Sequence, residues 1–305
     1  MGIGKGTLRA VFDIVSEKGT TSRKEISDIL GISMVAAHNA VDALVESGFL
    51  SVEKDSLRNT SPRGRKSEDV IISPHKLCLT IDFCKKNISF AISPLCSKID
   101  SFEAIPYSDM QDLEVNLDLA ASHIARYIER NNARPSFVAV AIPEFDKNFS
   151  TRDCENSLAR AGLPPDLIVS GAKAGGEFCS SLSGGIYAFV SVDHHAWGCS
   201  SAEPDRMLLW ENIKVGAHHG ESFASVLQYE KNEQNLCVYT KRFINAIDSV
   251  LSPDRIFISS TSLPDGIMDE IRKNEKLSDI SADSPVLNGL LKLSKNEIFN
   301  QSFDN

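Results

Sequence analysis

The first 50 residues carry apolar side chains at helical spacing, in three stretches that each end at a glycine. The positions expected to face inward are Leu8, Val11, Phe12 and Val15, then Ile26, Ile29 and Leu30, then Val35, Val41, Leu44 and Val45. Ser22 and Glu25 form a capping-box pattern before the second helix, and Ser33 is the expected cap of the third. One supporting helix followed by two short helices joined by a tight turn predicts a helix-turn-helix.

Alternating apolar and polar residues follow these helices. Residues 49–53 have the period of a strand, and residues 70–72 can pair with them as the return strand. Between them, residues 54–66 (KDSLRNTSPRGRK) carry Lys54, Arg58, Arg63, Arg65 and Lys66 against a single acidic residue, Asp55. We therefore expect residues 1–73 to form a winged helix-turn-helix domain with a basic wing tip.

The pattern changes near residue 77. Three short strands come in succession, followed by a helix over about 111–131 and a buried strand over 137–142. Helices and strands then alternate as far as a helix near 265–273, which predicts an α/β domain. We expect this second domain to span 74–305, with sub-lobes of about 74–168 and 169–305.

Charge is divided unevenly between the two expected domains. The chain carries 32 basic and 41 acidic residues; ten and eight of these lie in 1–66, so that segment has a net charge of +2 and the remainder −11. A locally basic module on an acidic body favours a protein that contacts DNA at one end. The seven cysteines form no CxxC pair, and no apolar run approaches the roughly 20 residues of a membrane helix. We therefore expect a cytoplasmic protein with reduced thiols and no membrane contact.

Three kinds of DNA contact are expected. The third helix would read base edges in the major groove with Ser33, Met34, Ala36, Ala37, His38 and Asn39. Phosphates would be contacted by Arg23 and Lys24 at the start of the second helix. A narrow minor groove would be followed by Arg63, Gly64, Arg65 and Lys66. The alternative interpretation is that these polar and basic residues form an ordinary solvated surface.

The order of elements resembles that of the ROK family of repressors and sugar kinases over nearly the whole chain. Its bacterial regulators join a winged helix, through a linker of G-R-P type, to an actin/hexokinase-like body, and RGRK at 63–66 stands at that linker. The body segments that resemble family motifs are LTIDFCKKNISFAI, VAVAIPEFD, LIVSGAKAGG, VSVDHHAWGC, VGAHHGES and SPDRIFISS. The resemblance implies an α+β / α/β chain whose ribonuclease-H-like, two-lobed body is shortened.

Several residues that the family's kinases need are replaced. The aspartate that acts as base falls on Gly171, which has no side chain to accept a proton. The sequence DHH stands at 193–195 in place of a glycine-rich phosphate loop. Cys237 alone stands where the family has a zinc-binding cysteine cluster, and one thiolate cannot build a tetrahedral site. The resemblance therefore implies a protein that is not an enzyme, with neither metal nor cofactor.

Binding of an effector is the function that we expect of the second domain, since its resemblance to the kinases lacks their catalytic residues. Its expected residues are Asp82, Glu144, His195, His218 and Glu221, and its expected ligand is a sugar or a related small molecule. The histidine pairs at 194–195 and 218–219 also allow a metal or ligand site built with Glu221. Neighbouring side chains of an extended chain point to opposite sides, so each pair offers one ligand to any one point.

These observations predict a DNA-binding transcriptional regulator, which we expect to be a repressor. A homodimer or homotetramer would present paired recognition helices to a palindromic operator in double-stranded DNA. Two alternatives stay open at this point. One is a divergent ROK sugar kinase that retains a winged helix, and the other is a scaffold whose winged helix contacts another protein.

Overall fold

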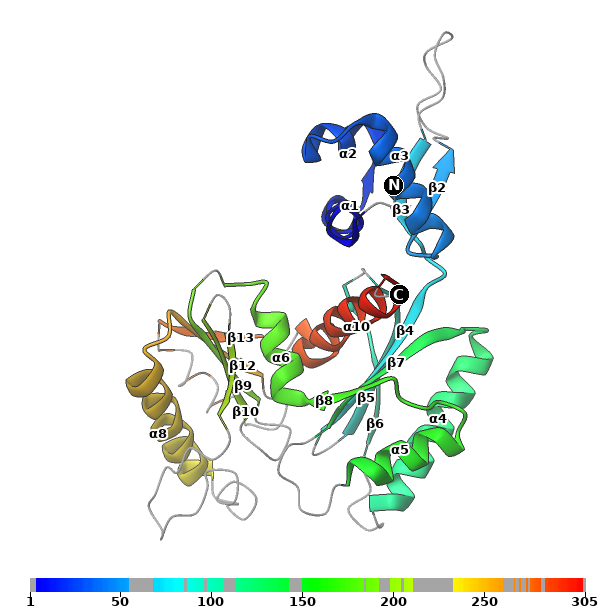
Figure 1. Cartoon of the computed structure of the whole chain (residues 1–305). Helices are drawn as coiled ribbons and strands as arrows, with labels where there is room; N and C mark the ends of the chain where they lie inside the picture. Colours follow the sequence, from blue (N-terminus) through cyan, green and yellow to red (C-terminus); the bar gives the residue numbers. More distant parts are fainter. Residues whose placement is uncertain are drawn as a thin grey trace. The chain divides into compact units, whose positions relative to one another are not determined.

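The computed structural model describes residues 4–54, 68–84, 87–95, 98–106, 113–142, 150–183, 185–191, 198–203, 206–210, 233–259, 275–280 and 283–303, with the single positions 266, 269 and 273. The chain forms two compact units (Figure 1). The N-terminal unit combines Met1–Cys78 with Ser93–Ser97 and Lys295–Asn305, and the body consists of Leu79–Ile92 and Lys98–Ser294.

Three helices and a small sheet make up most of the N-terminal unit. Its elements are α1 (Lys5–Lys18), β1 (Thr20–Thr21), α2 (Arg23–Leu30), α3 (Met34–Glu46), β2 (Leu50–Lys54) and β3 (Glu68–Ile72). The strands form an antiparallel sheet in the order β1-β3-β2. The three helices and the β2–β3 hairpin agree with the sequence prediction, whereas the two-residue strand β1 was not expected.

Local capping sets where α2 and α3 begin. The Glu25 backbone N–H donates to Ser22 Oγ at 3.2 Å, and Glu25 Oε2 accepts from the Ser22 N–H at 3.1 Å. This reciprocal pair is the predicted capping box. Gly31 ends α2 with a φ of +62°, a left-handed conformation that glycine adopts without a steric penalty. Ser33 then caps α3 by accepting from the Ala36 N–H at 3.2 Å.

Two side chains expected to face inward are exposed. Ile29 is 49% exposed and Val35 is 69% exposed. The buried residues of α3 are Ala37, Ala40, Val41 and Leu44. Each helical residue turns by about 100°, so Val35 lies roughly 200° from Ala37 and faces the opposite side. The prediction for Val35 was wrong because the buried stripe of α3 runs through Ala37 and Val41, on the other side of the helix.

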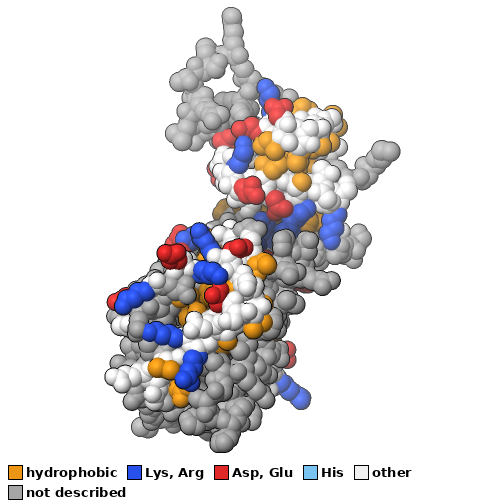
Figure 2. Space-filling view, turned by 90° about the vertical axis from the view of Figure 1, so that its left-hand side faces the viewer, with side chains coloured by type: hydrophobic (Ala, Val, Ile, Leu, Met, Phe, Trp, Pro, Cys, Tyr) orange, Lys and Arg blue, Asp and Glu red, His pale blue; other side chains and the backbone are white. Residues whose placement is uncertain are grey.

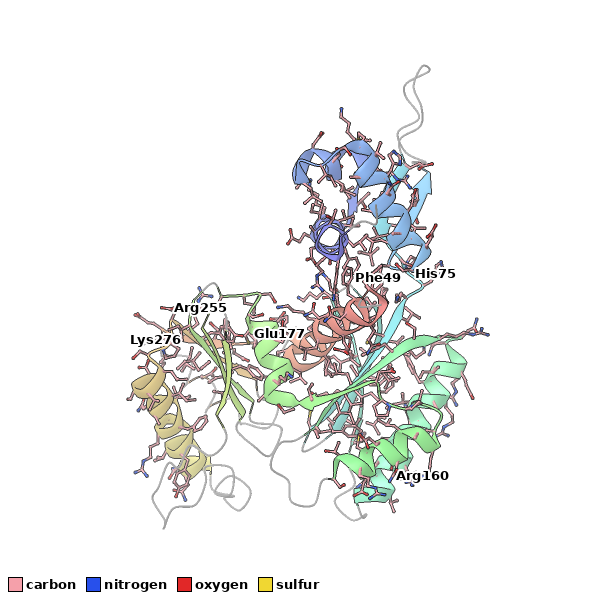
Figure 3. All side chains as sticks on the ribbon, viewed as in Figure 1. Phe49, His75, Arg160, Glu177, Arg255 and Lys276 are labelled. Atoms are coloured by element: carbon pink, nitrogen blue, oxygen red, sulfur yellow. The ribbon has the colours of Figure 1, made fainter. Side chains whose placement is uncertain are left out.

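The core of the N-terminal unit includes residues from the far end of the chain. The helix α10 (Pro285–Phe303) ends the described chain, and its residues from Lys295 onward belong to this unit. Phe299 packs against Phe12 of α1 and against Phe49, with ring centroids 5.7 and 5.4 Å apart. Figure 3 shows Phe49 beside the end of α10, where Phe303 also contacts its ring. The sequence analysis did not anticipate this helix.

The body contains two five-stranded sheets with the same strand pattern. The first has the order β6-β5-β4-β7-β8 and the second β11-β10-β9-β12-β13. The strands of the first are β4 (Leu77–Phe83), β5 (Asn87–Pro94), β6 (Glu103–Pro106), β7 (Pro135–Ile142) and β8 (Leu167–Ser170). Those of the second are β9 (Tyr187–Ser191), β10 (Gly198–Glu203), β11 (Arg206–Trp210), β12 (Arg255–Ser259) and β13 (Leu277–Asp279). In each sheet three strands consecutive in the chain are followed by two further strands on the other side.

Helices cover these sheets. The first sheet packs on α4 (Leu113–Arg130) and α5 (Thr151–Arg160) through a core that includes Phe83, Phe90, Ile124 and Leu158. The helix α6 (Gly171–Cys179) contacts β9 and β10 of the second sheet. The helix α8 (Glu233–Leu251) lies on the opposite face of that sheet (Figure 1). Most of the helix expected near 265–273 lies outside the described residues.

Membrane-spanning potential is low in the helices of the described ranges. None of these helices alone is both long and apolar enough to cross a bilayer; only α2 and α3 taken together, bent by 118°, reach that length and composition.

Candidate nucleic-acid interface

The outer face of α3 presents five neighbouring exposed residues. They are Ser33, Met34, Val35, His38 and Asn39. The helix has no acidic residue in its first turn. Its first acidic residue is Asp42, and the carboxylate of Asp42 is engaged by Arg23 at 2.6 Å. This face therefore combines hydrogen-bonding and apolar groups with no unpaired negative charge near its start, as a surface that meets DNA requires.

The residues of α3 expected to read bases do not all share this face. His38, Asn39 and Met34 are exposed, and Met34 is 43% exposed. Ala36 is half-buried, and Ala37 is completely buried within the N-terminal unit. The expectation that Ala37 reaches a base edge was therefore wrong. Ala37 belongs to the buried stripe of the helix, and Val35 takes its place on the outer face.

Hydrophobic side chains gather on one side of the N-terminal unit (Figure 2). Three large apolar side chains of its described part are exposed: Ile29 of α2 and Met34 and Val35 of α3. Sequence reasoning missed Ile29 and Val35 because it treated every branched apolar residue as core. The available signal was the spacing of Ala37, Ala40, Val41 and Leu44, which alone satisfies the i, i+3, i+4, i+7 pattern of a buried face.

Arg23 forms two ion pairs within the N-terminal unit. Its guanidinium donates to Asp42 of α3 and to Glu68 of β3, each at 2.6 Å, and its side chain is only 14% exposed. Its buried Nε lacks a hydrogen-bond partner among the described residues. Arg23 therefore ties α2 to α3 and to the hairpin. Its expected contact with a DNA phosphate stays a prediction.

Lys24 is the basic residue at the start of α2 that stays exposed. It directly follows Arg23 in the chain, so the two side chains point in different directions from the first turn of the helix. The neighbouring Glu25 has its pKa held below the ordinary value of 4.5, first by the hydrogen bond from the Ser22 backbone and then by that from the Thr21 hydroxyl. Glu25 thus stabilises the start of α2 in its charged form.

The expected basic wing tip connects β2 to β3, and the structure describes only the two strands. The β2–β3 register pairs Leu50 with Ile72 and Lys54 with Glu68. Residues 55–67 lie outside the described residues, and with them Arg63, Gly64, Arg65 and Lys66. The predicted minor-groove contacts of these four residues stay predictions.

In the body, Asp82 is the one residue of the expected effector site that lies within the described ranges. Asp82 of β4 is buried, and Cys84 Sγ donates to Asp82 Oδ2 at 3.2 Å. Gly171 is the first residue of α6 and is buried, while Ser170 caps this helix by accepting from the Lys173 N–H at 3.1 Å. Glu144, His195, His218 and Glu221 lie outside the described residues.

Across the described ranges, no cluster of three or more His, Cys, Asp or Glu side chains could hold a metal ion. The buried thiol of Cys154 has its pKa raised to about 12 by desolvation, so this thiol is protonated and is a poor ligand.

Comparison with known proteins adds a fold to these observations. No family model matches the sequence, and no curated protein does. Among solved structures, a ROK family transcriptional regulator, a homologue of the E. coli MLC protein, is similar with a TM-score of 0.65 at 12% identity over 98% of both chains. An inorganic polyphosphate/ATP-glucomannokinase from Arthrobacter sp. strain KM is similar with a TM-score of 0.54 at 15% identity, over 74% of this chain and 99% of its own. At these identities the likeness extends to the fold, so this chain has the fold of the ROK regulator along nearly its whole length.

Proposed function

We propose that this protein is a DNA-binding transcriptional regulator of the ROK type, acting as a repressor. Its N-terminal unit would be a winged helix-turn-helix in which α3 is the recognition helix and the β2–β3 hairpin is the wing. The observation that carries the proposal is the outer face of α3, where Met34, Val35, His38 and Asn39 are exposed on a capped helix with no acidic residue in its first turn. The shared fold with a ROK family transcriptional regulator supports it.

The interactions that hold α3 in place also suit a recognition helix. The N-terminal end of α3 is held by the Ser33 cap, and its middle is held by Arg23 through Asp42. A helix fixed at both places presents its outer residues in one orientation, which keeps the entropic cost of binding low. Lys24 and the wing residues Arg63 and Arg65 would supply phosphate and minor-groove contacts.

The body would act without catalysis. Its similarity to a glucomannokinase supports a fold descended from sugar kinases. The position that the sequence resemblance assigns to the catalytic base is Gly171, and this residue is buried at the start of α6. Removing a general base costs orders of magnitude in rate. We propose instead that the body binds a sugar-like effector and mediates assembly into a homodimer or homotetramer on the operator.

The direct test is binding of the full-length protein to a fluorescent fragment of the DNA upstream of its own gene, over a salt series. A scrambled duplex serves as competitor. We expect preferential binding whose affinity falls steeply as salt rises, because phosphate contacts release counterions. The double variant Arg63→Ala/Arg65→Ala should bind more weakly and with a shallower salt dependence.

Two results would count against this function. Folded protein that fails to bind DNA at low salt would favour a scaffold that uses the same surface for a protein partner. Phosphorylation of a hexose by ATP, above the rate without protein and abolished by unfolding, would favour the kinase. Unchanged affinity of the Arg63→Ala/Arg65→Ala variant would overturn the proposed role of the wing alone.

A further inference from the structure

The exposed valine of α3 is an unusual choice for a solvent-facing helix position. Val35 is 69% exposed, more than any other large apolar side chain that the structure describes. Valine is also a poorer helix former than alanine, because its branched Cβ restricts the side chain against the preceding turn. Neither core packing nor helix stability therefore explains this residue.

We propose that Val35 reads a thymine by packing on its 5-methyl group in the major groove, which makes it a specificity-determining residue. This inference rests on the proposed function. Thymine is the one base of DNA that displays a methyl group there, and apolar side chains recognise it by contact. Val35 is the second residue of α3. The N-terminal residues of a recognition helix are the ones that approach base edges.

The neighbours of Val35 fit the same surface. Asn39 stands one helical turn further on and is also exposed. A carboxamide can pair with the N6 and N7 atoms of adenine. Four residues of helix rise by about 6 Å, which is close to two base-pair steps of about 3.4 Å each. Val35 and Asn39 would therefore read A·T pairs about two base-pair steps apart in one half-site.

The alternative occupant of this patch is an apolar protein surface. A stable protein contact buries about 800 Å² on each partner and contains a clustered apolar core. The patch has three exposed apolar side chains, Ile29, Met34 and Val35, bordered by the polar residues Ser33, His38 and Asn39. Asp42, the first acid of α3, is held by Arg23. This patch is small and half of its residues are polar, which suits the groove edge of DNA better than the apolar core of a protein interface.

The experiment compares thymine with uracil, which lacks only the methyl group. A binding site is first selected from a random DNA pool with the full-length protein. Each thymine of the selected half-site is then replaced singly by deoxyuridine, and affinities are measured for the wild type and for Val35→Ala. Val35 is exposed and alanine favours helix, so this variant keeps the fold; its unfolding midpoint checks this. Val115→Ala, which truncates an exposed valine of α4, is the matched control.

We expect one thymine position at which uracil weakens wild-type binding about fourfold, the cost of exposing one buried methyl group. Val35→Ala should bind the thymine site about fourfold more weakly and lose the distinction between thymine and uracil at that position. Val115→Ala should bind the thymine site as the wild type does and should still distinguish thymine from uracil at that position. Specific binding without any such position, or with a distinction that survives in Val35→Ala, overturns the inference and leaves the regulator function standing. Failure to select any DNA overturns the proposed function itself.

Discussion

Phe299 stacks on Phe12, with ring centroids 5.7 Å apart and an interplanar angle of 23°, although the two residues come from opposite ends of the chain. Phe49 joins them from the start of the hairpin, with its ring edge on Phe12 at 5.2 Å. Arg9 and Lys295 lie over the rings of Phe299 and Phe12 at 5.2 and 4.8 Å. The last turns of the chain thus complete the hydrophobic core of the N-terminal unit.

Replacing Phe299 with alanine should therefore destabilise the N-terminal unit. Phe299 is fully buried, so the change leaves a cavity among three aromatic rings and should cost about 3 to 5 kcal/mol of unfolding free energy. Urea unfolding followed by circular dichroism measures this loss. Ser302→Ala, at an exposed position of the same helix, should have little effect. Equal stability of the two variants would show that the C-terminal turns do not belong to this core.

Substitution of Arg23 should lower the stability of the protein, whereas substitution of Lys24 should not. Arg23→Lys removes the planar group that joins Asp42 to Glu68, and we expect a loss of about 1 kcal/mol of unfolding free energy, limited because both carboxylates are about half exposed. Lys24→Ala should leave stability unchanged.

The same two variants separate a structural residue from a phosphate contact. In DNA-binding assays over a salt series, Lys24→Ala should reduce the slope of log affinity against log salt by about one unit. Arg23→Lys should leave that slope unchanged. A reduced slope for Arg23→Lys would mean that Arg23 gives up a carboxylate for a phosphate when DNA binds.

The body depends on a close crossing of α6 and α10. A methyl group at Gly289 of α10 would overlap the backbone carbonyl of Ala174, which cannot move as a flexible side chain could. Gly289→Ala should destabilise the body by about 2 to 3 kcal/mol, measured as a lower unfolding midpoint. Glu177 of α6 lies on the same crossing (Figure 3) and pairs with Lys292 of α10 at 2.9 Å.

Gly6 of α1 is the control for this substitution. An added methyl group at Gly6 would meet no atom within contact distance, so Gly6→Ala should preserve or slightly raise stability, because alanine favours helix. Tolerance of alanine at both glycines would contradict the close helix crossing.

The capping box predicts a pH dependence with a defined sign. Because the pKa of Glu25 is lowered on folding from its ordinary value of 4.5, its contribution is fully present above that value. The contribution is lost as pH falls through the lower folded value. Glu25→Gln cannot titrate but can keep the hydrogen bonds of the box. The free energy of unfolding of the wild type should therefore fall relative to that of Glu25→Gln as pH decreases below 4.5. A difference that does not change with pH would rule out this role of the charge.

Local signals of this sequence determined the three helices and the hairpin of its N-terminal part, although they did not reveal β1 or α10. Caps such as Ser22 and Ser33, the glycines after each helix, and the alternation in the hairpin are short-range interactions, so they can be read from neighbouring residues. The same signals located the strand triplet that begins the first sheet of the body. The α3 face was predictable in part: His38, Asn39 and Met34 are exposed as expected, since each lies off the buried stripe of the helix.

Tertiary structure alone decided which residues meet across the chain. Nothing local in Phe299 shows that its partner is Phe12, because a contact between distant segments depends on how the whole chain closes. Arg23 has the composition and position of a phosphate ligand, and only the approach of Asp42 and Glu68 makes it structural. Val35 is as apolar as a core residue, and the packing of Ala37 against the neighbouring helices turned it outward. The sequence determines which interactions each side chain is able to make. The fold determines which partner each side chain meets, because packing and charge pairing must be satisfied jointly over all elements.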